Sequence, residues 1–271
     1  MRTIACVLAL FLTFTTPAVA AFKTPLCSPH LAACGETLAD YDNSAAAAVY
    51  LPPVLVGGTG FKFELAGQRL YSIPEFDHYM ASVCMSSKHF GLGGQFTNIG
   101  DPDLYSETTA KFAGAYMVSS QFSAGLAFGY YRIDMGYDYE SLDQVATEVS
   151  FMFNANANLW FYGRLSNPTE PRICPGTVLH RELRLGAVFA GAGNVNLGTE
   201  VATRSGVDTR FKIGEKLKLT PSFSINAGII TAPFVASLGF DVSYNQFHLA
   251  YAYRYHPDLE GTHVWGISLR K

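Results

Sequence analysis

The stretch FHLAYAYRYHPDLEGTHVWGISLRK, residues 247–271, decides the fold of this chain. On both sides of a short polar loop, large and mostly aromatic or aliphatic side chains take every second position: Phe247, Leu249, Tyr251, Tyr253, Tyr255, then His263, Trp265, Ile267 and Leu269. Small or polar residues, among them His248 and Arg254, fill the alternate positions. A period of two is that of a β-strand, whose successive side chains point to opposite faces. The stretch therefore predicts a hairpin with one aromatic face and one polar face.

The same alternation recurs from about Gly60 to the end of the chain. It predicts strands at 60–70, 78–85, 89–97, 109–118, 122–133, 145–155, 158–166, 181–190, 194–204, 207–213, 217–229, 233–244, 246–255 and 262–270. The breaks between strands alternate between short ones, such as GEK at 214–216, and longer ones, such as SNPTEPRICPGTVLH at 166–180. About fourteen strands with short turns at one end and longer loops at the other are typical of bacterial outer-membrane barrels. We therefore expect an all-β fold, a transmembrane antiparallel β-barrel spanning residues 59–271.

The N-terminus indicates export from the cytoplasm. Arg2 precedes the apolar stretch IACVLALFLTF, and AVA at 18–20 has the form of a signal-peptide cleavage site. We therefore expect residues 1–20 to be a signal peptide and the protein to reside in the outer membrane of a Gram-negative-type bacterium. LAAC at 31–34 resembles a lipoprotein cleavage box, but a lysine, two prolines and a histidine separate it from the apolar stretch.

Composition agrees with a membrane barrel. Charged residues make up 15% of the chain and aromatic residues 14%, and there are 25 glycines, whereas ordinary soluble domains carry about 25% charged residues. The net charge of −3 provides no basic surface for nucleic acid. The non-aromatic strand faces are rich in Gly, Ala, Ser and Asn rather than Lys and Glu. We therefore expect the apolar face to meet lipid and the polar face to line the lumen. Several tyrosines near strand ends, Tyr130, Tyr131, Tyr244, Tyr253 and Tyr255, are expected in an interfacial girdle.

The strand register places charges of both signs in the lumen. The main candidates for ligand or lumen sites are Glu148, Arg184, Glu200, Arg204, Asp241 and Arg254. Two interpretations remain open: opposite charges pair across a narrow filled interior, or they line a polar conduit or a ligand site.

Residues 21–58 do not show the strand pattern. A helix-start signal at Asp42 or Asn43, a four-alanine run and Pro52-Pro53 predict a short helical or coil segment that folds into the barrel as a plug. Its stretch GETLADYDNSAAAAVYLPPVL resembles the N-terminal segment of PorV/PorQ-type outer-membrane proteins, within the FadL-like barrel superfamily. The plug residues singled out are Asp40, Asn43, Tyr50 and Pro52. The final stretch resembles the closing hairpin of the same family, with His256, Pro257, Gly261 and His263 in or beside its loop.

The resemblance implies a fourteen-stranded barrel with a plugged lumen. FadL-like relatives move hydrophobic small molecules across the outer membrane, and PorV-like relatives serve type IX protein secretion. A structural scaffold with a closed lumen, whose outer loops bind a partner, is the alternative. Expected partners are membrane lipid and either a hydrophobic ligand or secreted and secretion-system proteins; the oligomeric state is left open.

Catalytic and metal signatures are lacking. The sequence contains no GxSxG, HExxH or phosphate-cradling glycine loop, and no Cys/His spacing for a metal. We expect a non-enzyme without a cofactor. After export four cysteines remain, and Cys27 with Cys34 is the favoured disulfide, with four unpaired thiols as the alternative.

Overall fold

The computed structural model describes residue 22 and residues 26–136, 140–174, 177–191 and 194–271. The predicted signal peptide, residues 1–20, lies outside this part of the chain. Within it, no helix is both long enough and apolar enough to cross a membrane.

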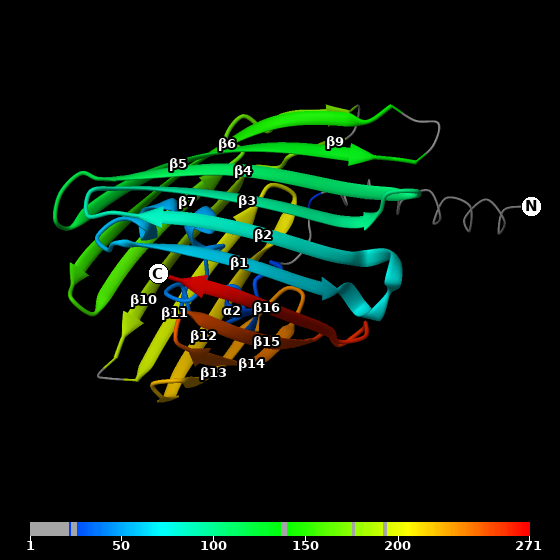
Figure 1. Cartoon of the computed structure of the whole chain (residues 1–271). Coiled ribbons are helices and arrows are strands. Elements are labelled where there is room, and N and C mark those ends of the chain that lie inside the picture. The colour runs from blue at the N-terminus through cyan, green and yellow to red at the C-terminus, as the bar shows by residue number, and fades with distance from the viewer. Residues whose placement is uncertain (1–21, 23–25, 137–139, 175–176, 192–193) are drawn as a thin grey trace, which may run out of the picture.

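Fourteen of the described strands form one closed antiparallel barrel (Figure 1). They are β1 Gly60–Arg69, β2 Asp77–Ser86, β3 Phe90–Asp101, β4 Tyr105–Met117, β5 Phe122–Asp134, β6 Leu142–Asn156, β7 Leu159–Ser166, β10 Glu182–Ala190, β11 Val195–Arg204, β12 Val207–Thr220, β13 Phe223–Ile230, β14 Val235–Tyr244, β15 Phe247–Tyr255 and β16 Thr262–Arg270. The barrel closes where β1 pairs with β16, with Lys62 opposite Arg270. The predicted fold class and strand number are confirmed.

Connection lengths divide the barrel into two ends. At the end that holds the chain terminus, which we call the C-terminal end, turns as short as residues 157–158 and 245–246 join the strands. At the opposite, loop end, the connections include residues 70–76 with the 3-10 turns η2 Leu70–Ser72 and η3 Pro74–Phe76. The longest, 167–181, carries the small hairpin β8 Arg172–Cys174 and β9 Thr177–Val178. The expected contrast between short turns and longer loops is therefore present.

The predicted turn at 214–216 is wrong. β12 continues through this stretch to Thr220, and the chain turns at residues 221–222 instead. The alternation is unbroken across it, with Phe211, Ile213 and Leu217 facing outward and Lys212 and Lys216 facing inward. The continued strand thus brings Lys216 into the lumen beside Lys212, which lay within the predicted strand 207–213, and the sequence interpretation missed both buried lysines.

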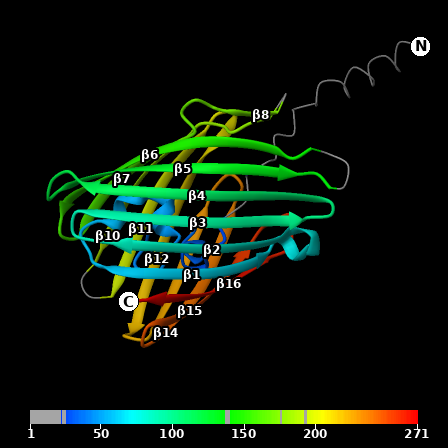
Figure 2. The same ribbon diagram turned by 45° about the horizontal axis from the view of Figure 1, so that its top comes forward.

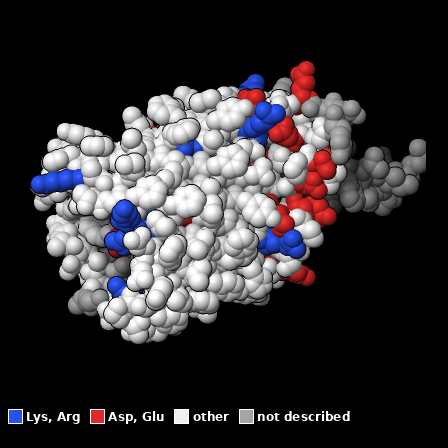
Figure 3. All heavy atoms as spheres, in the orientation of Figure 1, with Lys and Arg blue, Asp and Glu red and all other residues white. Residues whose placement is uncertain are grey.

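The outer face is the apolar one. Leu249 and Trp265 are each 56% exposed, whereas Ala252 and Val264, on the opposite face of the same hairpin, are fully buried. Figure 3 shows charged side chains gathered towards the ends of the barrel, with a wide, nearly uncharged band between them on the face shown. An apolar band of this extent is stable against hydrocarbon rather than water. The expected place of Tyr131 in the interfacial girdle is wrong. Its side chain is only 6% exposed and points inward, because it directly follows the outward-facing Tyr130 along the strand.

The N-terminal segment lies inside the ring of strands (Figures 1 and 2). It contains the helices α2 Pro29–Ala33 and α3 Ala47–Tyr50 and the 3-10 turn η1 Pro52–Leu55. The helix expected to start at Asp42 or Asn43 begins at Ala47 instead. Directly before the helix, the Glu64 carboxylate of the wall accepts hydrogen bonds from the backbone N–H groups of Ala45 and Ala46 at 2.8 and 3.2 Å. The first helical N–H, that of Ala47, donates to Ser44 Oγ at 3.3 Å.

Inward-facing glycines make room for this plug. A Cβ on Gly228 of β13 would lie 2.1 Å from the backbone nitrogen of Gly35. A Cβ on Gly125 of β5 would lie 2.7 Å from a ring carbon of Pro52. Real Cβ atoms do not approach other atoms so closely, so only glycine allows the plug to sit directly against the wall here.

Candidate functional site

The plug is held to the wall by buried charges. Lys212 of β12 lies between Glu36 of the plug, at 3.2 Å, and Glu200 of β11, at 3.0 Å. Arg254 of β15 approaches the other oxygen of Glu36 at 3.3 Å. The Tyr50 hydroxyl donates to Glu200 at 2.6 Å. Each carboxylate thus has a partner across the boundary between plug and wall, as buried charges require.

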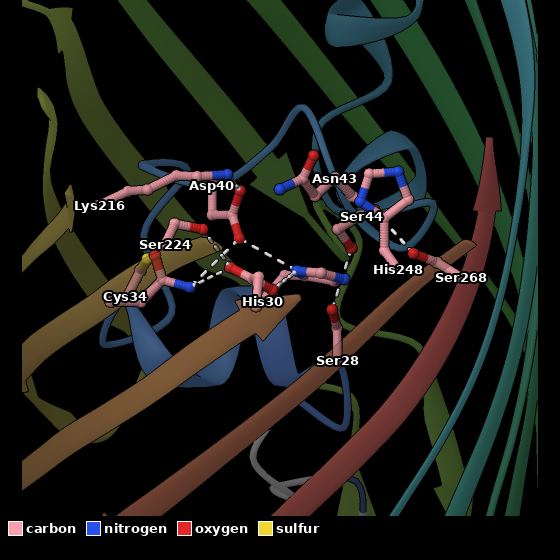
Figure 4. Close-up of polar contacts among 12 residues, drawn as sticks. Ser28, His30, Cys34, Asp40, Asn43, Ser44, Lys216, Ser224, His248 and Ser268 are labelled. Atoms are coloured by element: carbon pink, nitrogen blue, oxygen red, sulfur yellow. Dashed lines mark hydrogen bonds and ion pairs between the residues drawn. The ribbon is translucent and has the colours of Figure 1, made fainter. Parts of the chain in front are cut away.

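A second cluster lies around His30 (Figure 4). Its Nδ1 is 3.0 Å from Asp40 of the plug and 2.6 Å from Asp241 of β14, and Lys216 of β12 pairs with Asp40. Burial by itself lowers the pKa of His30, but the two carboxylates raise it well above its ordinary value. The imidazole is therefore cationic at neutral pH, and this cluster also joins plug to wall by paired charges.

His30, Asp40 and Asp241 offer ligand atoms within 4.8 Å of one another, close enough to hold a metal ion. Imidazole and carboxylate groups are ligands of divalent cations. However, Lys216 already neutralises Asp40, and His30 Nδ1 faces both carboxylates. The cluster is therefore satisfied as an ion-pair network without a metal.

The four singled-out plug residues have different surroundings. Asp40 and Tyr50 belong to the two charge clusters, and the guanidinium groups of Arg164 and Arg184 lie over the Tyr50 ring at 5.2 and 5.0 Å. Pro52 packs against Gly125. Asn43 contributes its backbone carbonyl oxygen, which accepts a 3.4 Å hydrogen bond from Ser268 of β16.

A cavity of about 300 Å³ lies above the plug at the loop end. Loop residues Tyr71, Asn167, Leu179 and His256 form part of its lining. Its charged lining consists of six cations, Lys111, Arg164, Arg184, Arg204, Arg210 and Arg254, and three carboxylates, Glu36, Glu148 and Glu182. Apolar lining is provided by residues such as Phe22, Tyr131 and Leu179. The cavity is thus polar and has more positive than negative groups.

A second cavity of about 310 Å³ opens at the C-terminal end. It is lined by Tyr41 and Trp160, whose rings are 5.1 Å apart, and by Lys62, Arg270 and other residues. No described residue lines both cavities. Plug residues such as Asp40 and Leu51 are fully buried. The lumen is therefore divided into two chambers by the plug.

The predicted lumen residues separate into two groups. Glu148, Arg184, Arg204 and Arg254 line the loop-end cavity. Glu200 and Asp241 are almost fully buried in the plug clusters. Residues that the sequence interpretation missed are Lys216, which lay in the assumed turn, Lys212, which lay within the predicted strand 207–213, and His30, Glu36 and Arg164. Apolar residues at 211, 213 and 217, interrupted on that face only by Glu215, were the signal that could have revealed the two lysines.

The loop residues of the closing hairpin do not converge on one site. His256 lines the loop-end cavity and accepts a hydrogen bond from the Asp258 backbone at 3.2 Å, whereas His263 is exposed on the outer face. The ring of Tyr253 occupies the space into which a Cβ on Gly261 would project, 2.2 Å from its hydroxyl oxygen. Pro257 is exposed.

The favoured disulfide is not formed, and Cys27 and Cys34 are both buried free thiols. The Sγ of Cys27 lies 3.4 Å from the carbonyl oxygen of His78 on β2, and that of Cys34 lies 3.7 Å from the carbonyl oxygen of Glu215 on β12. Helix α2 separates the two cysteines and directs them to different parts of the wall. Burial raises the pKa of both thiols.

Comparison with known proteins supports the fold. No family model and no curated protein matches the sequence. Among solved structures, the Ralstonia pickettii toluene transporter TbuX superimposes with a TM-score of 0.68 at 9% identity, over 90% of this chain and 97% of the other. The CymD monoaromatic hydrocarbon channel gives 0.66 at 10% identity, over 93% and 98%. A FadL homologue from Pseudomonas aeruginosa gives 0.65 at 10% identity, over 93% and 99%. The chain therefore has a FadL-like barrel fold.

Proposed function

We propose that this protein is a plugged outer-membrane barrel that transports hydrophobic small molecules and rests in a closed state. The observation that carries the proposal is the division of the lumen by the plug into a chamber at each end, of about 300 and 310 Å³. Two chambers in line are what a gated conduit needs, with entry at the loop end and exit at the C-terminal end. Transport by TbuX and CymD, which have the same fold, supports it.

In this proposal the plug must move for a solute to pass. Its contacts with the wall are mainly ion pairs, hydrogen bonds and close backbone packing rather than covalent bonds. Breaking these contacts between plug and wall costs a finite free energy, so a small population of protein with the plug displaced is compatible with the closed structure.

A reversible cross-link tests whether the plug moves. A Cβ on Gly93 of β3 would lie 3.6 Å from the Cβ of Ala48 in the plug, within the usual range for a disulfide. The variant Ala48→Cys/Gly93→Cys, with Cys84→Ser to remove a competing thiol, can therefore join plug to wall. We expect oxidation to abolish toluene uptake into proteoliposomes and reduction to restore it.

The barrel offers a matched control. The Cβ of Cys84 on β2 would lie 3.7 Å from a Cβ on Gly93, so Gly93→Cys alone joins two wall strands and leaves the plug free. Uptake should survive oxidation in this control. Uptake that persists in the plug-linked protein after oxidation would refute passage through a moving plug.

A second candidate function is a closed scaffold that supports protein secretion or surface attachment, as the resemblance to PorV/PorQ-type proteins implies. The observation that favours it is the dense set of matched charges across the middle of the lumen, such as Lys212 with Glu36 and Glu200. A barrel that conducts nothing can keep such a filled interior permanently.

Copurification from gently solubilised outer membrane distinguishes the two candidates. Secretion-system proteins bound to the loop end, together with no toluene uptake in any variant, would favour the scaffold. Bound hydrophobic small molecules and cross-link-sensitive uptake would favour transport. We propose no enzymatic activity, in keeping with the neighbouring structures, which are a transporter and a channel.

A further inference from the structure

The loop-end cavity contains a group of arginines with too few carboxylates. Arg184, Arg204 and Arg210 come from the adjacent strands β10, β11 and β12 and all line the cavity. In the strand register Arg204 lies opposite Glu182, which is two residues along β10 from Arg184, and Arg210 lies opposite Ala202, which is two residues along β11 from Arg204. Glu182 pairs with Arg184 at 3.0 Å. Within the described residues, Arg204 and Arg210 have no ion-pair partner.

Several of the guanidinium N–H groups in this cavity are buried without a hydrogen-bond partner in the described structure. They include the Nε groups of Arg184 and Arg204 and both Nε and Nη1 of Arg254. Arg254 is only 5% exposed, and its Nη2 alone is engaged, with the Leu26 carbonyl oxygen and Glu36. Buried donors are normally paired, and charged donors form their strongest hydrogen bonds with oxyanions. An oxyanion bound in the cavity would give these donors a partner.

An apolar surface lies beside the arginines. Tyr131 lines the same cavity as Arg204, and the ammonium group of Lys111 lies 5.7 Å from the centre of its ring. Its ring belongs to a buried cluster with Ile133 and Leu179, and the ring of Phe22 meets it edge-on at 5.1 Å. The same cavity therefore offers both positive charge and aromatic packing.

We infer that the loop-end cavity binds small aromatic acids, with the carboxylate on Arg204 and Arg210 and the ring against Tyr131 and Leu179. A cavity of about 300 Å³ suits a compact single-ring solute. The inference rests on the proposed function in that it names the substrate class of the entry chamber. It differs from the neutral hydrocarbons that CymD and TbuX carry, because it requires a charge on the solute.

Calorimetric titration of the full chain in detergent micelles tests the site. Benzoate and benzamide share a ring and nearly the same shape, and only benzoate is charged. We expect benzoate to bind at least tenfold more tightly than benzamide, and high salt to weaken it. Inorganic phosphate serves as the probe for an oxyanion without a ring and should compete only weakly.

The double variant Arg204→Gln/Arg210→Gln should reduce benzoate affinity at least tenfold. Arg132→Gln is the matched control, because Arg132 pairs with Asp134 near the loop end and does not line the cavity. Equal binding of benzoate and benzamide, or unchanged benzoate affinity in the double variant, would overturn the inference. Phosphate binding as tightly as benzoate would also overturn it, since the ring would then contribute nothing.

The oxidised plug-linked protein separates this inference from the proposed function. Benzoate should bind to it normally, because the cavity lies above the plug. Binding without any cross-link-sensitive uptake would refute transport and keep the site. Uptake of toluene without benzoate binding would refute the site and keep transport.

Discussion

Replacing Lys212 by methionine should release the plug. Lys212 is 2% exposed and pairs with Glu36 and Glu200. Removing one partner of a buried ion pair costs about 3–5 kcal/mol. Glu36 retains Arg254 at 3.3 Å, and Glu200 retains the hydroxyl of Tyr50 at 2.6 Å. These remaining partners reduce the loss, so we expect about 2 kcal/mol, which shifts the equilibrium towards a displaced plug about 30-fold.

Alkylation of Cys34 by a maleimide measures this shift. Cys34 is fully buried two residues before Glu36, so it reacts only when the plug leaves its seat. In a protein with every other cysteine replaced by serine, the alkylation rate follows the fraction of displaced plug, provided that opening and closing are fast. Lys212→Met should accelerate the reaction about 30-fold, given the free-energy estimate above.

Lys218→Met is the control, because Lys218 lies on the same strand but is exposed. Its alkylation rate should equal that of the unchanged protein. Circular dichroism of each variant shows whether the barrel itself stays folded. Equal rates in Lys212→Met and Lys218→Met, with both barrels folded, would mean that the buried charges do not hold the plug.

Two further predictions concern the same boundary between plug and wall. Gly228→Ala should displace the plug, because overpacking against it costs about 1–3 kcal/mol, and Cys34 should then be alkylated faster. Gly94→Ala is the control: its Cβ would have contacts no closer than 3.7 Å, so the alkylation rate should not change. Burial raises the pKa of Glu36, but the positive charges of Lys212 and Arg254 lower it by more than burial raises it, so the pKa lies well below its ordinary 4.5. Glu36 therefore stabilises the plug fully above about pH 4.5, and this stabilisation is lost only as the pH falls through the lowered pKa. Alkylation of Cys34 after a pulse at pH 5 should therefore show no release of the plug.

The alternation in the sequence was sufficient to predict the barrel. Each strand face is decided residue by residue, since neighbouring side chains must point to opposite sides and only one side meets hydrocarbon. This local rule placed Glu148, Arg184 and Arg254 in the lumen correctly. It failed at 214–216 because a glycine followed by two charged residues looks like a turn. In the structure Gly214 instead faces the plug, where an added Cβ would lie 2.1 Å from the Cys34 carbonyl oxygen.

The plug depended on contacts that no local pattern contains. The Glu64 carboxylate of the wall contacts Ser28, at the start of α2, and Ala45, just before α3, from 36 and 19 residues away in the chain. Cys27 and Cys34 are near in sequence, yet the path of α2 directs them to different strands. The sequence by itself therefore determined which side chains enter the lumen. Only the tertiary structure decided which of them meet the plug and which line a cavity, because that depends on where a non-repeating segment packs inside the closed barrel.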